Sequence, residues 1–244
     1  MGGREVSDPG IRGCLPRTTR VGERFPVLGT DGTPPLIPNW RDLPDVIDPS
    51  LVWHIIDQGN QGSCCACMGA GILMLGREVA GLDRTVISQA SIYAQGNGGS
   101  DQGMAIDTCL DILMNVGACP IDVIDQYDWQ GMRRGTWRAD WKEIAKRLRI
   151  KEAWDCPTID HIGSAYKKGF FTGYGARGHA VIRFGDNRDI NSWGRDWGNN
   201  GIGQWVSEQV LASEIQRYGA WAFRVGTDPD DDGDLPAPRF GLAG

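Results

Sequence analysis

Histidine is scarce in this chain, with three residues among 244. Imidazole is the commonest general base near neutral pH, so a hydrolytic site that uses one must choose among His54, His161 and His179. His54 lies in an apolar stretch, and the surroundings of His161 predict a surface helix. His179 follows a glycine-rich turn and opens an apolar run typical of a strand. We favour His179, because a rigid sheet can aim its ring.

The chain also lacks a long hydrophobic run and an excess of basic residues. Its most apolar stretch, residues 64–75, is too short to span a bilayer, which takes about 20 residues. The first ten residues have no apolar core, so we expect no signal peptide and a cytoplasmic location. A net charge of −6 gives no electrostatic basis for binding nucleic acid. We therefore expect neither a membrane nor a nucleic-acid partner.

The cysteines do not form the even set typical of a disulfide framework. Their number is seven, and three of them cluster as Cys64, Cys65 and Cys67. This usage favours a chain made in a reducing compartment. A disulfide such as Cys109–Cys119 is the alternative.

Cys64 has the surroundings of an activated nucleophile. Glycine-rich residues 59–63 lead into it, and the small and apolar residues that follow predict a buried helix. Amide groups and the dipole at a helix N-terminus stabilise a thiolate, and a nearby imidazolium lowers the thiol pKa further. His179, in Gly-His-Ala-Val-Ile, and Asn191, in Asn-Ser-Trp-Gly, follow in that order. The combination predicts a cysteine hydrolase.

These patches resemble the papain-like (C1) cysteine peptidases over roughly residues 41–225. The resemblance implies that Cys64 is the nucleophile, His179 the general base and Asn191 the residue that orients the imidazole. It implies substrate and oxyanion contacts by Gln58 (oxyanion hole), Gly98 and Gly99 (a wall that pairs with substrate backbone) and Trp193 (a shield over the His–Asn hydrogen bond).

The resemblance implies hydrolysis of peptide or protein substrates by acyl transfer. The Cys64 thiolate attacks the carbonyl, His179 protonates the leaving amine, and water hydrolyses the thioester. No metal or organic cofactor is expected. Gln61 and Cys65 stand where the family usually has Cys and Trp, so the cleft is reshaped and an altered substrate preference is expected.

Three alternatives rest on single features. Cys64-x-x-Cys67 at a helix start resembles a thioredoxin-like redox site. Zinc ligation by Cys64, Cys67, Cys109 and Cys119 lacks metal-ligand spacing. Residues 228–234 begin like a calcium loop, but Arg239 stands where that loop needs a bidentate Glu.

The expected fold is α+β and papain-like, with a helical left lobe, a β-sheet or barrel right lobe and the active cleft between them. We divide the chain into an extended Pro/Gly-rich arm (1–40), a catalytic domain (41–226) and an acidic tail (227–244). Helices are expected at 64–79, 103–116, 137–147 and 208–217, and strands at 149–154, 179–184, 189–193, 201–206 and 220–225.

The arm is too rich in proline to be a helical inhibitory propeptide, so we expect it to cross a surface and leave the cleft open. Fixing its backbone costs about 1–2 kcal/mol per residue, so neighbouring subunits or the catalytic lobes must supply contacts that order it. Partner subunits suggest an alternative function, a structural component of a larger assembly such as a phage or virus particle. Such a component keeps the papain-like fold with or without activity.

Overall fold

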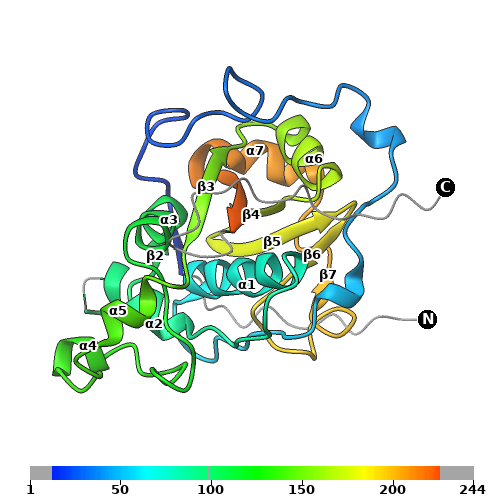
Figure 1. Ribbon diagram of the computed structural model, residues 1–244. Coiled ribbons are helices and arrows are strands. Elements are labelled where there is room, and N and C mark those ends of the chain that lie inside the picture. The colour runs from blue at the N-terminus through cyan, green and yellow to red at the C-terminus, as the bar shows by residue number, and fades with distance from the viewer. Residues whose placement is uncertain (1–12, 98, 226–244) are drawn as a thin grey trace.

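The computed structural model describes residues 13–97 and 99–225. Its fold is α+β, with a mainly helical lobe packed beside a lobe built on a six-stranded antiparallel sheet (Figure 1). The helices and 3-10 turns (η) are η1 (Trp40–Asp42), η2 (Pro49–Leu51), α1 (Cys64–Val79), α2 (Gln89–Gly96), α3 (Ile106–Asn115), α4 (Gly131–Arg134), α5 (Trp141–Ala145), α6 (Ile159–Lys167) and α7 (Glu208–Tyr218).

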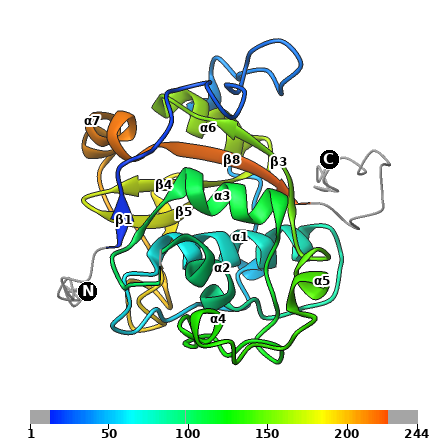
Figure 2. The ribbon, with the colours of Figure 1, turned by 90° about the vertical axis from the view of Figure 1, so that its left-hand side faces the viewer.

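The large sheet has the strand order β3-β8-β4-β5-β6-β7. Its strands are β3 (Ile150–Asp155), β4 (Phe171–Ala176), β5 (His179–Gly185), β6 (Arg188–Ile190), β7 (Ile202–Gly203) and β8 (Ala220–Val225). A second, two-stranded sheet pairs β1 (Cys14–Leu15) in parallel with β2 (Met104–Ala105). Helices α6 and α7 lie on one side of the large sheet and α1 on the other (Figures 1 and 2).

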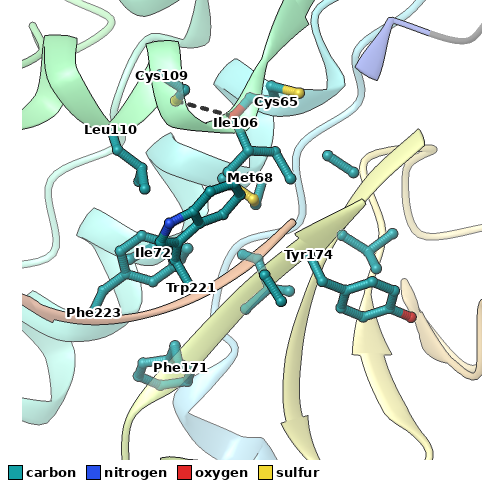
Figure 3. Close-up of a cluster of buried hydrophobic side chains, with 14 of the residues drawn as sticks. Cys65, Met68, Ile72, Ile106, Cys109, Leu110, Phe171, Tyr174, Trp221 and Phe223 are labelled. Carbon is teal, nitrogen blue, oxygen red and sulfur yellow. Dashed lines mark hydrogen bonds between the residues drawn. The ribbon is translucent and has the colours of Figure 1, made fainter. Parts of the chain in front are cut away.

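Helix α1 is the element that joins the two lobes. Its residues from Cys64 to Leu75 are all buried, as a helix that is apolar on every side requires. Glycine at position 71 lets α1 approach β5 closely, because a Cβ there would lie 2.7 Å from Ile182 Cδ1. Figure 3 shows Met68 and Ile72 of α1 packed with Trp221 and Phe223 of β8. The position of the α1 N-terminus relative to the sheet is therefore fixed by core packing.

Tight turns connect the strands that carry the expected catalytic residues. Arg177 and Gly178 both have positive φ, 52° and 74°, which makes the two-residue β4–β5 hairpin that precedes His179. Gly185 pairs with Arg188, so a two-residue turn also joins β5 to β6.

The N-terminal arm, of which residues 13–40 are described, packs on the catalytic lobes. Two buried carboxylates hold it. The carboxylate of Asp155 on β3 forms an ion pair of 2.6 Å with Arg17. Asp107 on α3 accepts hydrogen bonds from the backbone and hydroxyl groups of Thr18 and Thr19. The contacts that order this part of the arm therefore come from the same chain.

Candidate active site

Cys64 is the first residue of α1 and is completely buried. Burial by itself raises the pKa of its thiol. Contact with the Cys65 thiol, and the hydrogen bond and charge of the His179 imidazole, outweigh burial and lower the pKa of Cys64 well below its ordinary value. The thiol at the helix N-terminus is therefore the one poised to ionise, whereas burial raises the pKa of Cys67 and Cys109.

His179 begins β5, and Asn191 follows the end of the adjacent strand β6. The imidazole Nε2 lies 2.7 Å from Asn191 Oδ1. That oxygen also accepts a hydrogen bond of 2.7 Å from the Ser192 backbone amide, which fixes the orientation of the Asn191 side chain. Because Nε2 is bonded to Asn191, the other ring nitrogen is left to interact with Cys64. Within the described residues Nδ1 has no hydrogen-bond partner.

Two tryptophans enclose the imidazole. The Trp193 ring lies 4.6 Å from the His179 ring, with 30° between their planes, and covers it. The Trp205 ring contacts it edge-on at 5.4 Å and 71°. Sequence reasoning selected Trp193 but missed Trp205, whose backbone follows the short strand β7. These rings exclude water from the His179–Asn191 hydrogen bond, which strengthens it.

The Gln58 side chain is buried and held at both ends. Its Oε1 accepts a hydrogen bond of 2.6 Å from the Ser192 hydroxyl, so its amide nitrogen faces away from Ser192. One proton of that nitrogen is donated to the Gln61 carbonyl, at 2.8 Å. The second amide proton is left for a further acceptor. This arrangement suits a donor to a developing oxyanion.

Residues 13–15 of the arm lie between the two lobes, contrary to the expectation that the arm would leave the cleft open. The Cys14 amide donates to the Gly178 carbonyl at 2.9 Å, directly before His179. The Gly13 carbonyl accepts from the Met104 amide at 2.8 Å. Residues 13–15, hereafter the cleft segment, thus bridge the sheet lobe and the helical lobe. Figure 2 shows β1, in blue, beside the ends of β4 and β5.

The cleft segment fits there because Gly13 and Gly103 leave room for the backbones to approach. A Cβ on Gly13 would collide with the Gly62 carbonyl, two residues before Cys64. A Cβ on Gly103 would collide with the Gly13 carbonyl. The expectation failed because it judged the arm by its lack of helix pattern. An extended chain needs only edge hydrogen bonds and small neighbours to occupy a cleft.

No protein-family model and no curated protein matches the sequence. Solved structures do match the fold. Xylellain, a cysteine protease from Xylella fastidiosa, superposes with a TM-score of 0.69 at 19% identity, over 88% of this chain and 96% of the other. The precursor of recombinant stem bromelain gives 0.63 at 15% identity, over 89% and 78%. Digestive procathepsin L 3 of Tenebrio molitor gives 0.59 at 14%, over 88% and 77%.

The fold is papain-like. It confirms the expected α+β architecture with two lobes. At these identities the likeness establishes the fold alone, and the chemistry must be argued from the residues of this chain.

The glycine wall expected at Gly98 and Gly99 stays a prediction. Gly98 lies outside the described residues. Gly99 accepts a hydrogen bond from Arg133 through its carbonyl, 3.3 Å away. The backbone that pairs with the cleft segment is that of Met104, next to Gly103.

The structure also shows where the other two histidines lie and whether the cysteines considered as zinc ligands come together. His54 packs on Trp53, at 5.5 Å between rings, and His161 bonds to the Thr158 hydroxyl at 2.7 Å. All seven cysteines lie in the described part of the chain and are free and buried. Cys109 donates to the Cys65 carbonyl and Cys119 to that of Trp141, so these thiols do not converge on a zinc ion. The calcium-like stretch 228–234 lies outside the described residues.

A buried ion pair beneath the site was missed by sequence reasoning. Arg183 of β5 donates to Asp189 of β6 at 2.6 Å, and both side chains are almost fully buried. Asp189 also accepts from the Tyr174 hydroxyl and from the Trp205 backbone amide, each at 2.9 Å. The ion pair therefore ties together the strands that carry His179 and Asn191.

None of the described helices is long and apolar enough to cross a membrane.

Proposed function

We propose that the protein is a cysteine peptidase that hydrolyses peptide bonds through Cys64, His179 and Asn191. The observation that carries the proposal is the lowered pKa of the Cys64 thiol beside an imidazole that Asn191 holds at 2.7 Å. A structural cysteine buried in a core has a raised pKa, as Cys156 does here. The arrangement instead matches a nucleophile, a base and an orienting group.

In the proposed reaction the Cys64 thiolate attacks the carbonyl carbon of the scissile amide. The oxyanion that forms accepts hydrogen bonds from the Gln58 side chain and the Cys64 backbone amide. His179, as the imidazolium, gives its proton to the leaving amine, and the C–N bond breaks to leave a thioester. Water then gives a proton to His179 and hydrolyses the thioester, which restores the thiolate–imidazolium pair.

The described conformation is closed, because Cys64 has no exposed surface and the cleft segment lies beside it. We therefore take the arm to be an inhibitory segment that must move before substrate binds. Its intramolecular contacts also remove the reason for invoking partner subunits around residues 13–40. Nothing in this part of the chain favours a particle component over a peptidase.

The proposal is tested with a cysteine-directed epoxide and a denatured protein substrate. A chain that begins at Pro16 keeps the contacts of Arg17, Thr18 and Thr19 but lacks the cleft segment. We expect this chain to hydrolyse the substrate and to be labelled at Cys64 faster than the full chain. The matched control is Arg20→Ala, which changes an exposed residue of the same arm. If the shortened chain folds but is neither labelled nor active, the protein is not a peptidase of this kind.

A further inference from the structure

Two thiols from distant parts of the chain meet next to Cys64. Cys14 belongs to the cleft segment and is 5% exposed, and Cys65 belongs to α1 and is fully buried. In the small parallel sheet Cys14 is the register partner of Met104. The Cys65 thiol donates to the carbonyl of the same Met104, at 3.0 Å. The Cys14 backbone and the Cys65 thiol thus meet at one residue of β2.

The two thiols also affect each other's ionisation. Burial, together with hydrogen-bonding contacts to the Cys14 and Cys64 thiols, raises the pKa of Cys65 well above its ordinary value. Contact with Cys65 lowers the pKa of Cys14, but burial and the charges of nearby groups outweigh it and the net shift is upward. Both are therefore neutral thiols near pH 7.

The position of Cys65 explains why it, and not Cys64, is the partner. Cys64 and Cys65 are consecutive, so a bridge between them would need a strained eight-membered ring. Cys14 comes from a separate segment that runs alongside β2 and can be bridged without unwinding α1. Cys64 interacts with the imidazole, whereas Cys65 points toward β2 and the arm.

We propose that Cys14 and Cys65 form a disulfide under oxidising conditions, and that this bond locks the cleft segment over Cys64. Two S–H bonds break and one S–S bond forms. The oxidant is a two-electron acceptor such as hydrogen peroxide, whose O–O bond breaks and whose oxygens leave as two water molecules. A dithiol reductant reverses the step and frees the segment. Formation of the bond is independent of the proposed peptidase function, whereas its effect on turnover rests on that function.

The contacts of the neighbouring arm residues make the lock effective. Arg17 is paired with Asp155, and Thr18 and Thr19 are bonded to Asp107, so the chain is already fixed a few residues after Cys14. With the arm unlinked, the described contacts that must break for the cleft to open are the backbone hydrogen bonds of Gly13 and Cys14 and the packing around them. With the disulfide formed, the segment is fixed on both sides.

The test oxidises the full chain with diamide, which takes up the two hydrogens and becomes its hydrazine. Trypsin then releases residues 13–17 as a peptide, because arginines stand at positions 12 and 17. We expect this peptide linked to the peptide that contains Cys65, in wild type and in Cys64→Ala, but not in Cys65→Ala or Cys14→Ala. A link that persists in Cys65→Ala and disappears in Cys64→Ala would overturn the assigned pairing.

The second readout is epoxide labelling of Cys64, which requires no substrate. Diamide should slow labelling of the wild type about 30-fold or more, since a cross-link strongly restricts the open state. A dithiol reductant should restore it, and Cys14→Ala should stay insensitive. Cys156→Ala is the matched control, because Cys156 is equally buried but pairs with no other thiol among its described contacts. No linked peptide in oxidised wild type would refute the lock.

The two readouts separate failure of the lock from failure of the proposed peptidase. A linked peptide together with absent proteolysis in every reduced form would sink the peptidase and keep the disulfide. Normal proteolysis that diamide leaves unchanged would sink the lock alone.

Discussion

His179 and Asn191 stand at neighbouring strands of one sheet, with the imidazole Nε2 2.7 Å from the Asn191 side-chain oxygen. The β5–β6 hairpin sets this distance through the pairing of Ile182 with Ile190. The orienting hydrogen bond is thus built into the register of two strands. A one-residue slip would turn one of the two side chains to the opposite face.

Replacing Asn191 tests this relationship. Asn191→Ala leaves the hairpin intact but frees the imidazole to rotate. We expect turnover by the chain that begins at Pro16 to fall about 10- to 100-fold, less than the roughly 10²–10⁴-fold that an acid–base group itself contributes, because His179 is retained. Asn191→Asp, which keeps an acceptor oxygen, should retain more of the activity than the alanine variant. Equal loss in both variants would mean that the hydrogen bond does not orient the ring.

The pH dependence of Cys64 labelling follows from its lowered pKa. Because the thiolate persists below the ordinary thiol range, labelling of the chain that begins at Pro16 should remain fast at neutral pH. In His179→Ala the hydrogen bond and charge of the imidazole are lost while the contact with Cys65 remains, so the pKa of Cys64 rises. Labelling should then become significant only at alkaline pH. A profile that His179→Ala leaves unshifted would show that the imidazole does not activate the thiol.

Trp205 is expected to position the imidazole by its edge-on contact at 5.4 Å. Trp205→Leu removes the ring but keeps the backbone hydrogen bond to Asp189. We expect kcat to fall several-fold with little change in KM, together with a displaced pH profile for Cys64 labelling. Trp141→Leu provides the control, since that ring packs on Trp137 in the helical lobe. Loss of stability alone, with an unchanged pH profile, would assign Trp205 to the core.

The Arg183–Asp189 pair should dominate the stability of the sheet around the site. Asp189→Ala leaves a buried guanidinium without its carboxylate, which costs about 3–5 kcal/mol in the free energy of unfolding. Urea denaturation measures this change. The control is Asp140→Ala, which removes the partner of the exposed Arg138 and should change the unfolding midpoint little. A small effect of Asp189→Ala would mean that water reaches Arg183.

The helix that carries Cys64 was predicted correctly from the sequence. It has the predicted bounds, because an uninterrupted run of small and apolar residues favours a buried helix. The last strand also has the predicted bounds, 220–225. By contrast, β4 was missed, since Gly173 and Gly175 break the strand pattern. They are tolerated because Met68 and Tyr218 pack against them. The helix expected at 137–147 is limited to Trp141–Ala145, and α2 was not predicted.

The sequence by itself selected Cys64, His179 and Asn191 as the candidates for nucleophile, base and orienting group, because residue type and order carry that information locally. Only the tertiary structure decided what surrounds them. The contact of Trp205 with His179, the ion pair under the sheet and the pairing of Cys14 with Met104 join residues far apart in the chain. Such contacts depend on strand register and on which glycines admit a neighbouring backbone. No local sequence pattern predicts that residues 13–15 of an extended arm lie beside Cys64. Backbone hydrogen bonds along a strand edge depend little on which side chains the segment carries.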